Sequence, residues 1–191
     1  MLTFDESAHA YYWNGERVPG VTSILGPLVD FRGVPLAVLE AKADLGRRVH
    51  LATELDDVDD LDESSVESDV SPYLEAWRRF KREKRVEIEA VERKVYHPTY
   101  RYAGALDRVL RFDGARWLSD IKTSVEVAAT AGPQTAAYLM ANADPTISRR
   151  AAIQLRPDGS YRVRELNDPQ DWPVFLSCLT INNFKAKHND D

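Results

Sequence analysis

Residues 102–112 read YAGALDRVLRF, and residues 116–123 read RWLSDIKT. Both stretches are rich in the apolar residues that favour strands, and the pair Asp113-Gly114 between them is typical of a two-residue hairpin turn. The pattern therefore predicts two adjacent antiparallel strands. Each strand carries one aspartate, Asp107 in the first and Asp120 in the second.

The second strand also places an amine beside its aspartate. Side chains alternate between the two faces of a strand, so Asp120 and Lys122 face the same way while Ile121 points into the core. Because Asp107 lies on the neighbouring strand, we expect two carboxylates and one amine on one side of the sheet. Such an arrangement is costly in free energy unless a metal ion or an anionic substrate compensates the charges.

The rest of the chain alternates between helical and strand patterns. The pair Asn14-Gly15 predicts a hairpin over residues 10–18. Helical spacing and early prolines predict helices over residues 22–29, 35–54, 73–84, 132–142 and 169–187. Alternation and turn residues predict further strands over residues 86–90, 91–96, 149–156 and 160–165. We expect a single domain over residues 1–191, with an N-terminal hairpin at 8–20, a core at 35–187 and a frayed tail at 188–191.

The composition narrows the functional classes. The 191 residues suffice for one domain with a proper core. Cys178 is the only cysteine, which excludes an intramolecular disulfide and cysteine-based zinc or iron–sulfur sites. No apolar run approaches the length of a membrane span, and the first residues lack the basic and apolar regions of a signal peptide. We therefore expect a cytoplasmic protein without a membrane partner.

The net charge of −6 hides an asymmetry between two segments. Residues 54–69 contain nine acids and no base, and we expect a solvated loop or a frayed helix end there. Residues 78–85 contain six bases and one acid, on a predicted helix. This basic face is either plain surface or a stripe that contacts phosphates, because an acidic protein can still present a local basic track.

A histidine lies on the first long predicted helix. Leu36, Leu39, Ala43, Gly46 and His50 recur at three- and four-residue spacing and define one face. Gly46 costs about 1 kcal/mol relative to alanine in a helix, which suggests that its backbone approaches another group closely. Taken alone, His50 is more often a core histidine than a metal ligand, and both interpretations stay open at this point.

The two aspartates and the lysine could perform metal-assisted hydrolysis of a phosphodiester bond. Asp107 and Asp120 would hold one or two Mg²⁺ ions, which prefer oxygen ligands and keep several waters. The ion would lower the pKa of a bound water and offset charge in the transition state. Lys122 would orient or help to deprotonate that water, or would stabilise the transition state. The carbonyl oxygen of Ile121 is a further oxygen ligand, and Gly104 would let a phosphate backbone pass close to the strand.

Four short motifs occur in order along the chain. They are Gly46-x-x-x-His50, Gly104-x-x-Asp107, Asp120-Ile121-Lys122 and Gln134-x-x-x-Tyr138. Together they resemble the motifs of the PD-(D/E)xK nuclease superfamily, most closely the branch that contains the RecB nuclease domain and phage-type exonucleases. The resemblance covers roughly residues 36–141. It implies an α+β fold, with a central mixed β-sheet flanked by helices in a restriction-endonuclease-like core.

The resemblance also implies roles for individual residues. The family uses Mg²⁺ or Mn²⁺, and the match implies that His50 is a metal ligand in addition to Asp107 and Asp120. Gln134 and Tyr138 would position DNA near the scissile phosphate. The implied activity is that of a Mg²⁺-dependent deoxyribonuclease, an exonuclease of recombination or repair that a phage or prophage could encode. No phosphate-binding GxxxxGK[ST] loop is present, so unwinding would need a helicase or recombination partner.

Two other interpretations remain open from the sequence. A catalytically silent member of the same fold could use its sheet to bind DNA or a protein. Alternatively, Asp107 and Asp120 could merely pair with Arg101 and Lys122 in a structural network. Glu92 often has a family counterpart on the first core strand, but the sequence assigns it no role.

Overall fold

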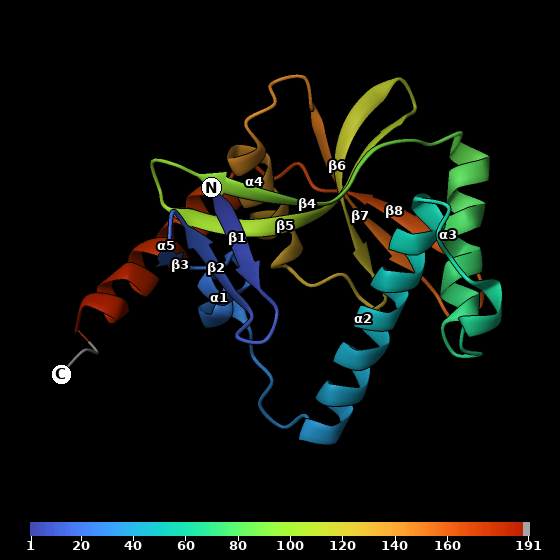
Figure 1. Ribbon diagram of the computed structural model, residues 1–191, viewed down its shortest axis with the longest axis horizontal. Helices are drawn as coiled ribbons and strands as arrows, with labels where there is room; N and C mark the ends of the chain where they lie inside the picture. The colour runs from blue at the N-terminus through green and yellow to red at the C-terminus, as the bar shows by residue number, and fades with distance from the viewer. Residues whose placement is uncertain (189–191) are drawn as a thin grey trace.

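The computed structural model describes residues 1–188 and has an α+β architecture (Figure 1). A small antiparallel sheet, in the order β1-β2-β3, is formed by Leu2–Asp5, Ala10–Trp13 and Glu16–Val18. A larger sheet, in the order β4-β5-β6-β7-β8, is formed by Glu87–His97, Tyr102–Phe112, Ala115–Lys122, Arg149–Leu155 and Tyr161–Glu165. Its neighbouring strands are antiparallel except β6 and β7, which are parallel. The expected α+β class with a mixed central sheet is confirmed.

Helices cover both faces of the larger sheet. They are α1 (Val21–Ile24), α2 (Leu36–Asp57), α3 (Ser71–Lys84), α4 (Ala131–Asn142) and α5 (Asp171–His188), with short 3₁₀ turns at Gly26–Leu28 and Glu63–Ser65. α2 and α3 lie against one face, and α1, α4 and α5 pack against the other (Figure 1). Within residues 1–188, no helix combines the length and the apolar character that a membrane crossing requires. The expected frayed tail falls on residues 189–191, outside the described residues, except for His188, which ends α5.

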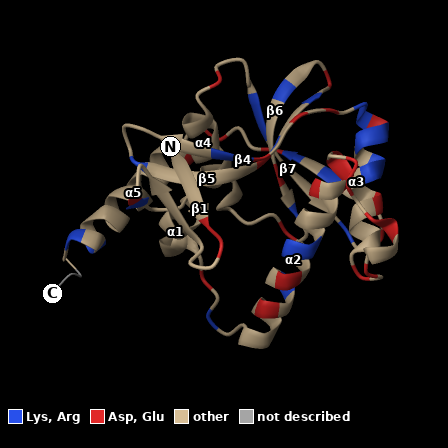
Figure 2. Ribbon diagram, in the orientation of Figure 1, with Lys and Arg blue, Asp and Glu red and all other residues tan. Residues whose placement is uncertain are grey.

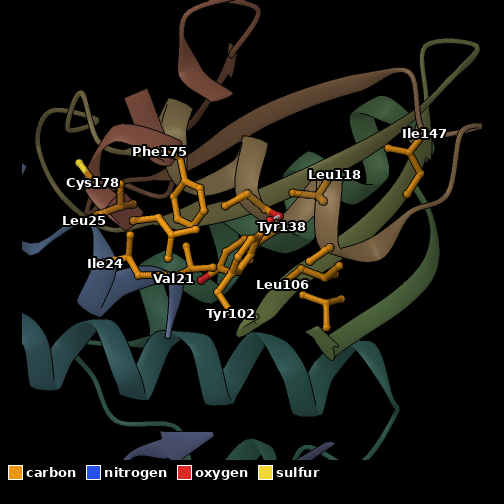
Figure 3. Close-up of a cluster of buried hydrophobic side chains, with 14 of the residues drawn as sticks. Val21, Ile24, Leu25, Tyr102, Leu106, Leu118, Tyr138, Ile147, Phe175 and Cys178 are labelled. Carbon is orange, nitrogen blue, oxygen red and sulfur yellow. Dashed lines mark hydrogen bonds between the residues drawn. The ribbon is translucent and has the colours of Figure 1, made fainter. Parts of the chain in front are cut away.

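Each face of the sheet has its own hydrophobic cluster. The cluster under α1, α4 and α5 contains Tyr102, Leu118 and Tyr138 (Figure 3). The cluster under α2 and α3 contains Trp77 and Ile121. Since Leu118 and Ile121 belong to opposite clusters, β6 alternates as predicted, and Asp120 and Lys122 lie on the α4 side of the sheet.

Both predicted hairpin turns are present. Asn14 and Gly15 have φ values of 52° and 85°, and Asp113 and Gly114 have φ values of 48° and 74°. Positive φ at both central residues is the geometry of a type I′ turn, whose twist matches that of the flanking strands. The strand at Leu2–Asp5 was not predicted; it pairs with β2 and extends the N-terminal hairpin to three strands.

The first long helix is present, and its predicted face is half-buried at Leu39, Gly46 and His50 but exposed at Leu36 and Ala43. α2 ends at Asp57, and Pro35 precedes it in an extended conformation with ψ of 137°. Leu36 is 68% exposed, and the helix fully buries side chains only from Val49 onward. The first turns of α2 extend away from the body of the sheet (Figure 1), so apolar residues there have little to pack against.

The acidic segment at residues 54–69 spans the end of α2 and the loop after it, and several of its acids pair with basic residues. Asp56 Oδ2 lies 2.7 Å from Lys81 Nζ, and Asp56 also pairs with Arg78 at 2.6 Å. Asp69 pairs with Arg48 on α2 at 2.8 Å. Residues 58–60 and 62–65 are exposed, as expected of a solvated loop, while the paired acids tie α2 to α3.

The basic face of α3 is correspondingly not a free phosphate-contacting stripe. Arg79 pairs with Glu83 at 2.7 Å, and Lys84 pairs with Asp113 at 2.8 Å. Figure 2 shows acidic and basic segments together on α2 and α3. Of the two interpretations that the sequence left open, the structure favours a surface whose charges are largely compensated within the molecule.

Arg108 on β5 is a fully buried charge. Its Nε donates to Asp57 Oδ2 at 2.7 Å, and both side chains are 0% exposed. Its Nη2 donates to Thr53 Oγ1 at 3.3 Å, and its guanidinium carbon lies 5.7 Å from the centroid of the Trp77 ring. Removing one partner of such a pair is strongly destabilising, because the other charge stays buried without compensation.

Replacing Arg108 therefore tests the packing between α2 and the sheet. We expect Arg108→Leu to lower the free energy of unfolding by about 3–5 kcal/mol. Urea denaturation followed by circular dichroism measures the change. The control is Arg111→Leu on the same strand, whose side chain is 49% exposed and should contribute less than about 1 kcal/mol. Equal losses for the two variants would contradict a special role for the buried pair.

Candidate metal centre

The pairing of β5 with β6 stops one residue short of Asp107 and Asp120. Their ladder of paired residues ends with Arg108 opposite Ser119. Beyond that pair, the backbone N–H of Ile121 donates to Asp107 Oδ2 at 2.7 Å. The Asp107 carboxylate thus satisfies a buried amide group, and this hydrogen bond fixes its orientation between the separating strands.

Three side chains from different elements converge at this point. His50 from α2, Glu92 from β4 and Asp107 from β5 offer ligand atoms that all lie within 4.8 Å of one another. His50 Nδ1 is 3.6 Å from Asp107 Oδ2 and 3.9 Å from Glu92 Oε1. The side chains of His50 and Glu92 are 32% and 28% exposed, so the group is open to solvent on one side. This arrangement could hold a metal ion.

The ring of His50 is oriented for ligation by its second nitrogen. Nε2 lies 3.0 Å from the carbonyl oxygen of Ile121, which can only accept, so Nε2 carries the proton. Nδ1 therefore faces the carboxylates. A backbone carbonyl that holds the far nitrogen of a histidine is the usual outer support of a metal ligand. The Ile121 carbonyl, expected from the sequence to bind metal directly, acts here first as the partner of His50.

Glu92 is the member of the group whose role sequence reasoning missed. The segments predicted as two strands, 86–90 and 91–96, form the single strand β4, whose register shifts between Ile88 and Ala90. Glu92 itself has a φ of 43°, an uncommon value for a residue other than glycine. Arg108 Nη1 donates to Glu92 Oε1 at 3.1 Å and so helps to hold the carboxylate. Val91 pairs with Arg108 and Arg93 with Leu106, so the register of β4 against β5 places Glu92 opposite Asp107, which alternation alone could not reveal.

Asp120 lies beside the three-residue group and not within it. Its carboxylate oxygen Oδ2 forms an ion pair with Lys122 Nζ at 2.7 Å. Lys122 Nζ also donates to Gln134 Oε1 at 3.2 Å, and Gln134 Nε2 donates to Tyr138 Oη at 3.3 Å. The buried Asp120 carboxylate is therefore compensated by one ammonium and adds its negative charge at the edge of the group. The residues present thus fit a metal ion, although the mixed imidazole and carboxylate set does not select one ion.

The titratable groups of the site shift one another's pKa values. Burial opposes the protonation of His50, but the carboxylates of Asp107, Glu92 and Asp120 outweigh it and raise the pKa of His50 to about 9. Burial also raises the pKa of Asp120; the charge of Lys122 opposes this shift and that of Asp107 adds to it. A protonated His50 is thus what the acids favour when no metal is bound.

Lys122 is a charged group at neutral pH. Burial tends to lower the pKa of its amine, but the charges of Asp120 and Asp107 outweigh burial and raise it. An ammonium with a raised pKa is a poor proton acceptor. Of the roles considered from the sequence, stabilisation of negative charge therefore suits Lys122 better than deprotonation of water.

The structure gives Gly104 and Tyr138 roles different from those predicted. A Cβ added at Gly104 would lie 2.5 Å from Tyr138 Cε1, so the ring occupies the space through which a phosphate backbone was expected to pass. Tyr138 is only 4% exposed, and its hydroxyl accepts the hydrogen bond from Gln134. Direct contact of either residue with DNA is therefore corrected to a positioning role. At Gly46 an added Cβ would meet Thr123 Oγ1 at an ordinary 3.8 Å, so no close approach requires that glycine.

The purely structural interpretation of the aspartates agrees with only one of the two expected ion pairs. Lys122 does pair with Asp120, but Arg101 pairs with Glu16 of the N-terminal hairpin and not with Asp107.

Comparisons with known proteins found no relative of this chain. No family matches it, and no curated protein gives a significant match. The site is therefore interpreted from its own geometry.

Proton release should accompany metal binding. Since His50 is protonated below a pKa of about 9, a metal ion at Nδ1 must displace a proton, and affinity should rise with pH up to that value. In the metal-free protein, stability changes with pH in the opposite direction to metal affinity. The charged His50 stabilises the fold fully below its ordinary pKa, and this contribution is lost as the pH rises through about 9. Calorimetric titration with Mn²⁺ at pH 7, in two buffers of different ionisation enthalpy, should show about one proton released per ion.

The matched variant for this titration is His50→Gln. It should lose most of the proton release, whereas Asp120→Asn should keep the part due to His50. Binding of Mn²⁺ by the wild type without any proton release would rule out His50 as a ligand. Failure of Mn²⁺ to bind at all would argue against a metal centre.

Replacement of Gly104 tests the packing of the ring beneath the site. We expect Gly104→Ala to destabilise the protein by about 1–3 kcal/mol, because the new methyl group would overlap the ring of Tyr138. Thermal unfolding measures the loss, and Gly26→Ala, where an added Cβ meets nothing within 4 Å, is the control. In a Tyr138→Ala background the penalty at Gly104 should largely disappear. An unchanged penalty there would show that the ring is not its cause.

Proposed function

We propose that this protein is a metal-dependent nuclease that hydrolyses phosphodiester bonds in DNA, as an exonuclease of recombination or repair. The observation that supports this most is the convergence of His50, Glu92 and Asp107 beside a buried Asp120–Lys122 pair. The order of motifs along the chain resembles the PD-(D/E)xK superfamily, and the mixed sheet flanked by helices is compatible with it. The proposed ion is Mg²⁺ or Mn²⁺, held by Asp107 with Glu92 and His50.

The chemistry of hydrolysis needs a cation, a nucleophile and compensation of developing charge. A bound divalent ion would supply an activated water and polarise the phosphoryl oxygen. The protein supplies carboxylates that hold the ion, with Asp107 fixed by the amide of Ile121 and Glu92 held by Arg108. Asp120, which is ion-paired with Lys122, is an additional carboxylate at the edge of the group.

Lys122 would compensate the negative charge that develops on the phosphate. Its amine remains protonated, and the hydrogen bond to Gln134 fixes its direction. Tyr138 holds Gln134 in turn, so these two residues position the amine from behind. A preorganised ammonium in a partly buried site stabilises a transition state more strongly than one in water, because no solvent must reorganise.

Substitution at the site tests the proposed activity directly. We expect wild-type protein with Mg²⁺ or Mn²⁺ to digest linear DNA, and we expect Asp107→Asn, Asp120→Asn and Lys122→Met each to reduce the rate by at least about 10²-fold. Release of nucleotides from labelled linear and circular DNA measures the rate. Digestion of linear DNA alone indicates an exonuclease.

The control for these variants is Lys94→Met on β4, which removes one positive charge from a strand without touching the acids of the site. It should retain close to full activity. Binding of DNA by wild-type protein without metal-dependent cleavage would instead favour a catalytically silent member of the fold. Equal activity of wild type and Asp107→Asn would remove Asp107 from the mechanism.

A further inference from the structure

The β7–β8 hairpin carries a second cluster of charges next to the site. Arg156, Arg162 and Arg164 line a cavity of about 320 Å³, together with Gln154 and the loop at residues 125–127. Arg162 and Arg164 are exposed, and Arg156 is half-buried. The cavity is therefore a solvent-accessible hollow with guanidinium groups on its walls.

These three arginines are only weakly compensated by the molecule itself: the pKa of Asp158 is lowered mainly by hydrogen bonds from Ser160 and to a smaller extent by the charge of Arg156. Within residues 1–188, no carboxylate approaches any of them within the 4.0 Å of an ion pair, although most other arginines, including Arg149 and Arg150 on the same hairpin, have acidic partners. Glu126 lines the cavity but makes no such pair. Several like charges around one hollow raise its positive potential, which favours an anion.

The register of the sheet connects this cavity to the candidate metal centre. Lys122 on β6 lies opposite Gln154 on β7, which in turn lies opposite Arg162 on β8. Directly paired residues share a face, so all three point to the side on which Asp120 lies. Two strand spacings separate Lys122 from Arg162, a distance of about 10 Å. Phosphates of one strand are displaced around the helix axis as well as along it, so a separation of this size suits phosphates of neighbouring nucleotides.

The walls of the cavity are held in place by hydrogen bonds. Gln154 Nε2 donates to the carbonyl oxygens of Ser124 and Val125 at 2.7 and 2.6 Å. Arg164 donates to the carbonyl oxygen of Val127 at 3.2 Å and so fastens the loop to β8. Arg156 and Arg162 make no side-chain contact of this kind among the described residues. They remain available to a ligand.

We infer that Arg156 and Arg162, supported by Arg164, form a subsite for a backbone phosphate of the nucleic-acid strand whose scissile phosphate lies beside Lys122. This inference rests on the proposed function for the identity of the strand. Guanidinium groups suit the site because their planar donors bind phosphate oxygens in pairs. The subsite would hold the strand close to the reacting bond and would contribute affinity without reading the bases.

Salt-dependent binding tests the subsite without relying on catalysis. Fluorescence anisotropy with a labelled oligonucleotide, without divalent ions and between 50 and 200 mM salt, gives the slope of log affinity against log salt. We expect the double variant Arg156→Gln with Arg162→Gln to reduce the magnitude of that slope by about 0.7–0.9, the value for one phosphate contact, and to weaken binding on the order of tenfold at low salt. The double variant Arg156→Lys with Arg162→Lys should retain most of the slope, because the charges remain.

The matched control is Arg17→Gln with Arg82→Gln, which removes the same charge from residues that lie outside this cavity and make no ion pair in the described chain. It should leave the slope nearly unchanged. An equal loss in the control, an unchanged slope in the cavity variant, or no DNA binding by the wild type would overturn the subsite. If the wild type cleaves DNA but the cavity variant binds it unchanged, the subsite is contradicted and the nuclease function stands. If the wild type does not cleave DNA but its binding loses salt dependence in the cavity variant, the nuclease function is contradicted and the subsite stands.

Discussion

The hydrogen bond from the Ile121 amide to Asp107 Oδ2 is the contact on which the rest of the site depends. It lies where β5 and β6 stop pairing, so the backbone amide would otherwise be buried without a partner. The same backbone segment supplies the Ile121 carbonyl that holds His50. One short stretch of β6 therefore orients a carboxylate through its N–H and an imidazole through its C=O. Where the two strands separate, the N–H and the C=O of Ile121 are both free of strand partners and bind the side chains of Asp107 and His50 instead.

A second constraint is that so many acids in one place must be compensated. Arg108 joins Asp57 in the core to Glu92 at the site, so the stability of the α2 packing and the geometry of the ligand group share one guanidinium. Lys122 compensates Asp120 on the other side. The acids facing the opening between these cations keep His50 protonated in the absence of metal. The acids of the site are thus held by two fixed cations, Arg108 and Lys122.

Local patterns predicted more of the fold than of the site. The turns at Asn14 and Asp113, the strands on either side and the alternation along β6 follow from nearest-neighbour rules, which act within a few residues. The predicted face of α2 is exposed at Leu36 because helical spacing does not report where the sheet ends. Glu92 was given no role because its place depends on the pairing of β4 with β5, and the ion pairs of the acidic segment were not predicted because partners such as Lys81 lie on a different helix. Each failure involves a contact distant in sequence.

The charges change sign in a regular way across the larger sheet, and this order favours a nucleic-acid strand over a compact ligand. Carboxylates on β4 and β5 face a place for a cation, Lys122 follows on β6, and unpaired arginines lie on β8. A small anion would use only one of these positions. A chain of phosphates could use all of them at once, with one phosphate bridged through a metal ion to the acids and later ones held by the amine and the guanidiniums. In the proposed nuclease, a cation among the acids would offset their repulsion of the phosphates, which a protein that only bound DNA would have to overcome.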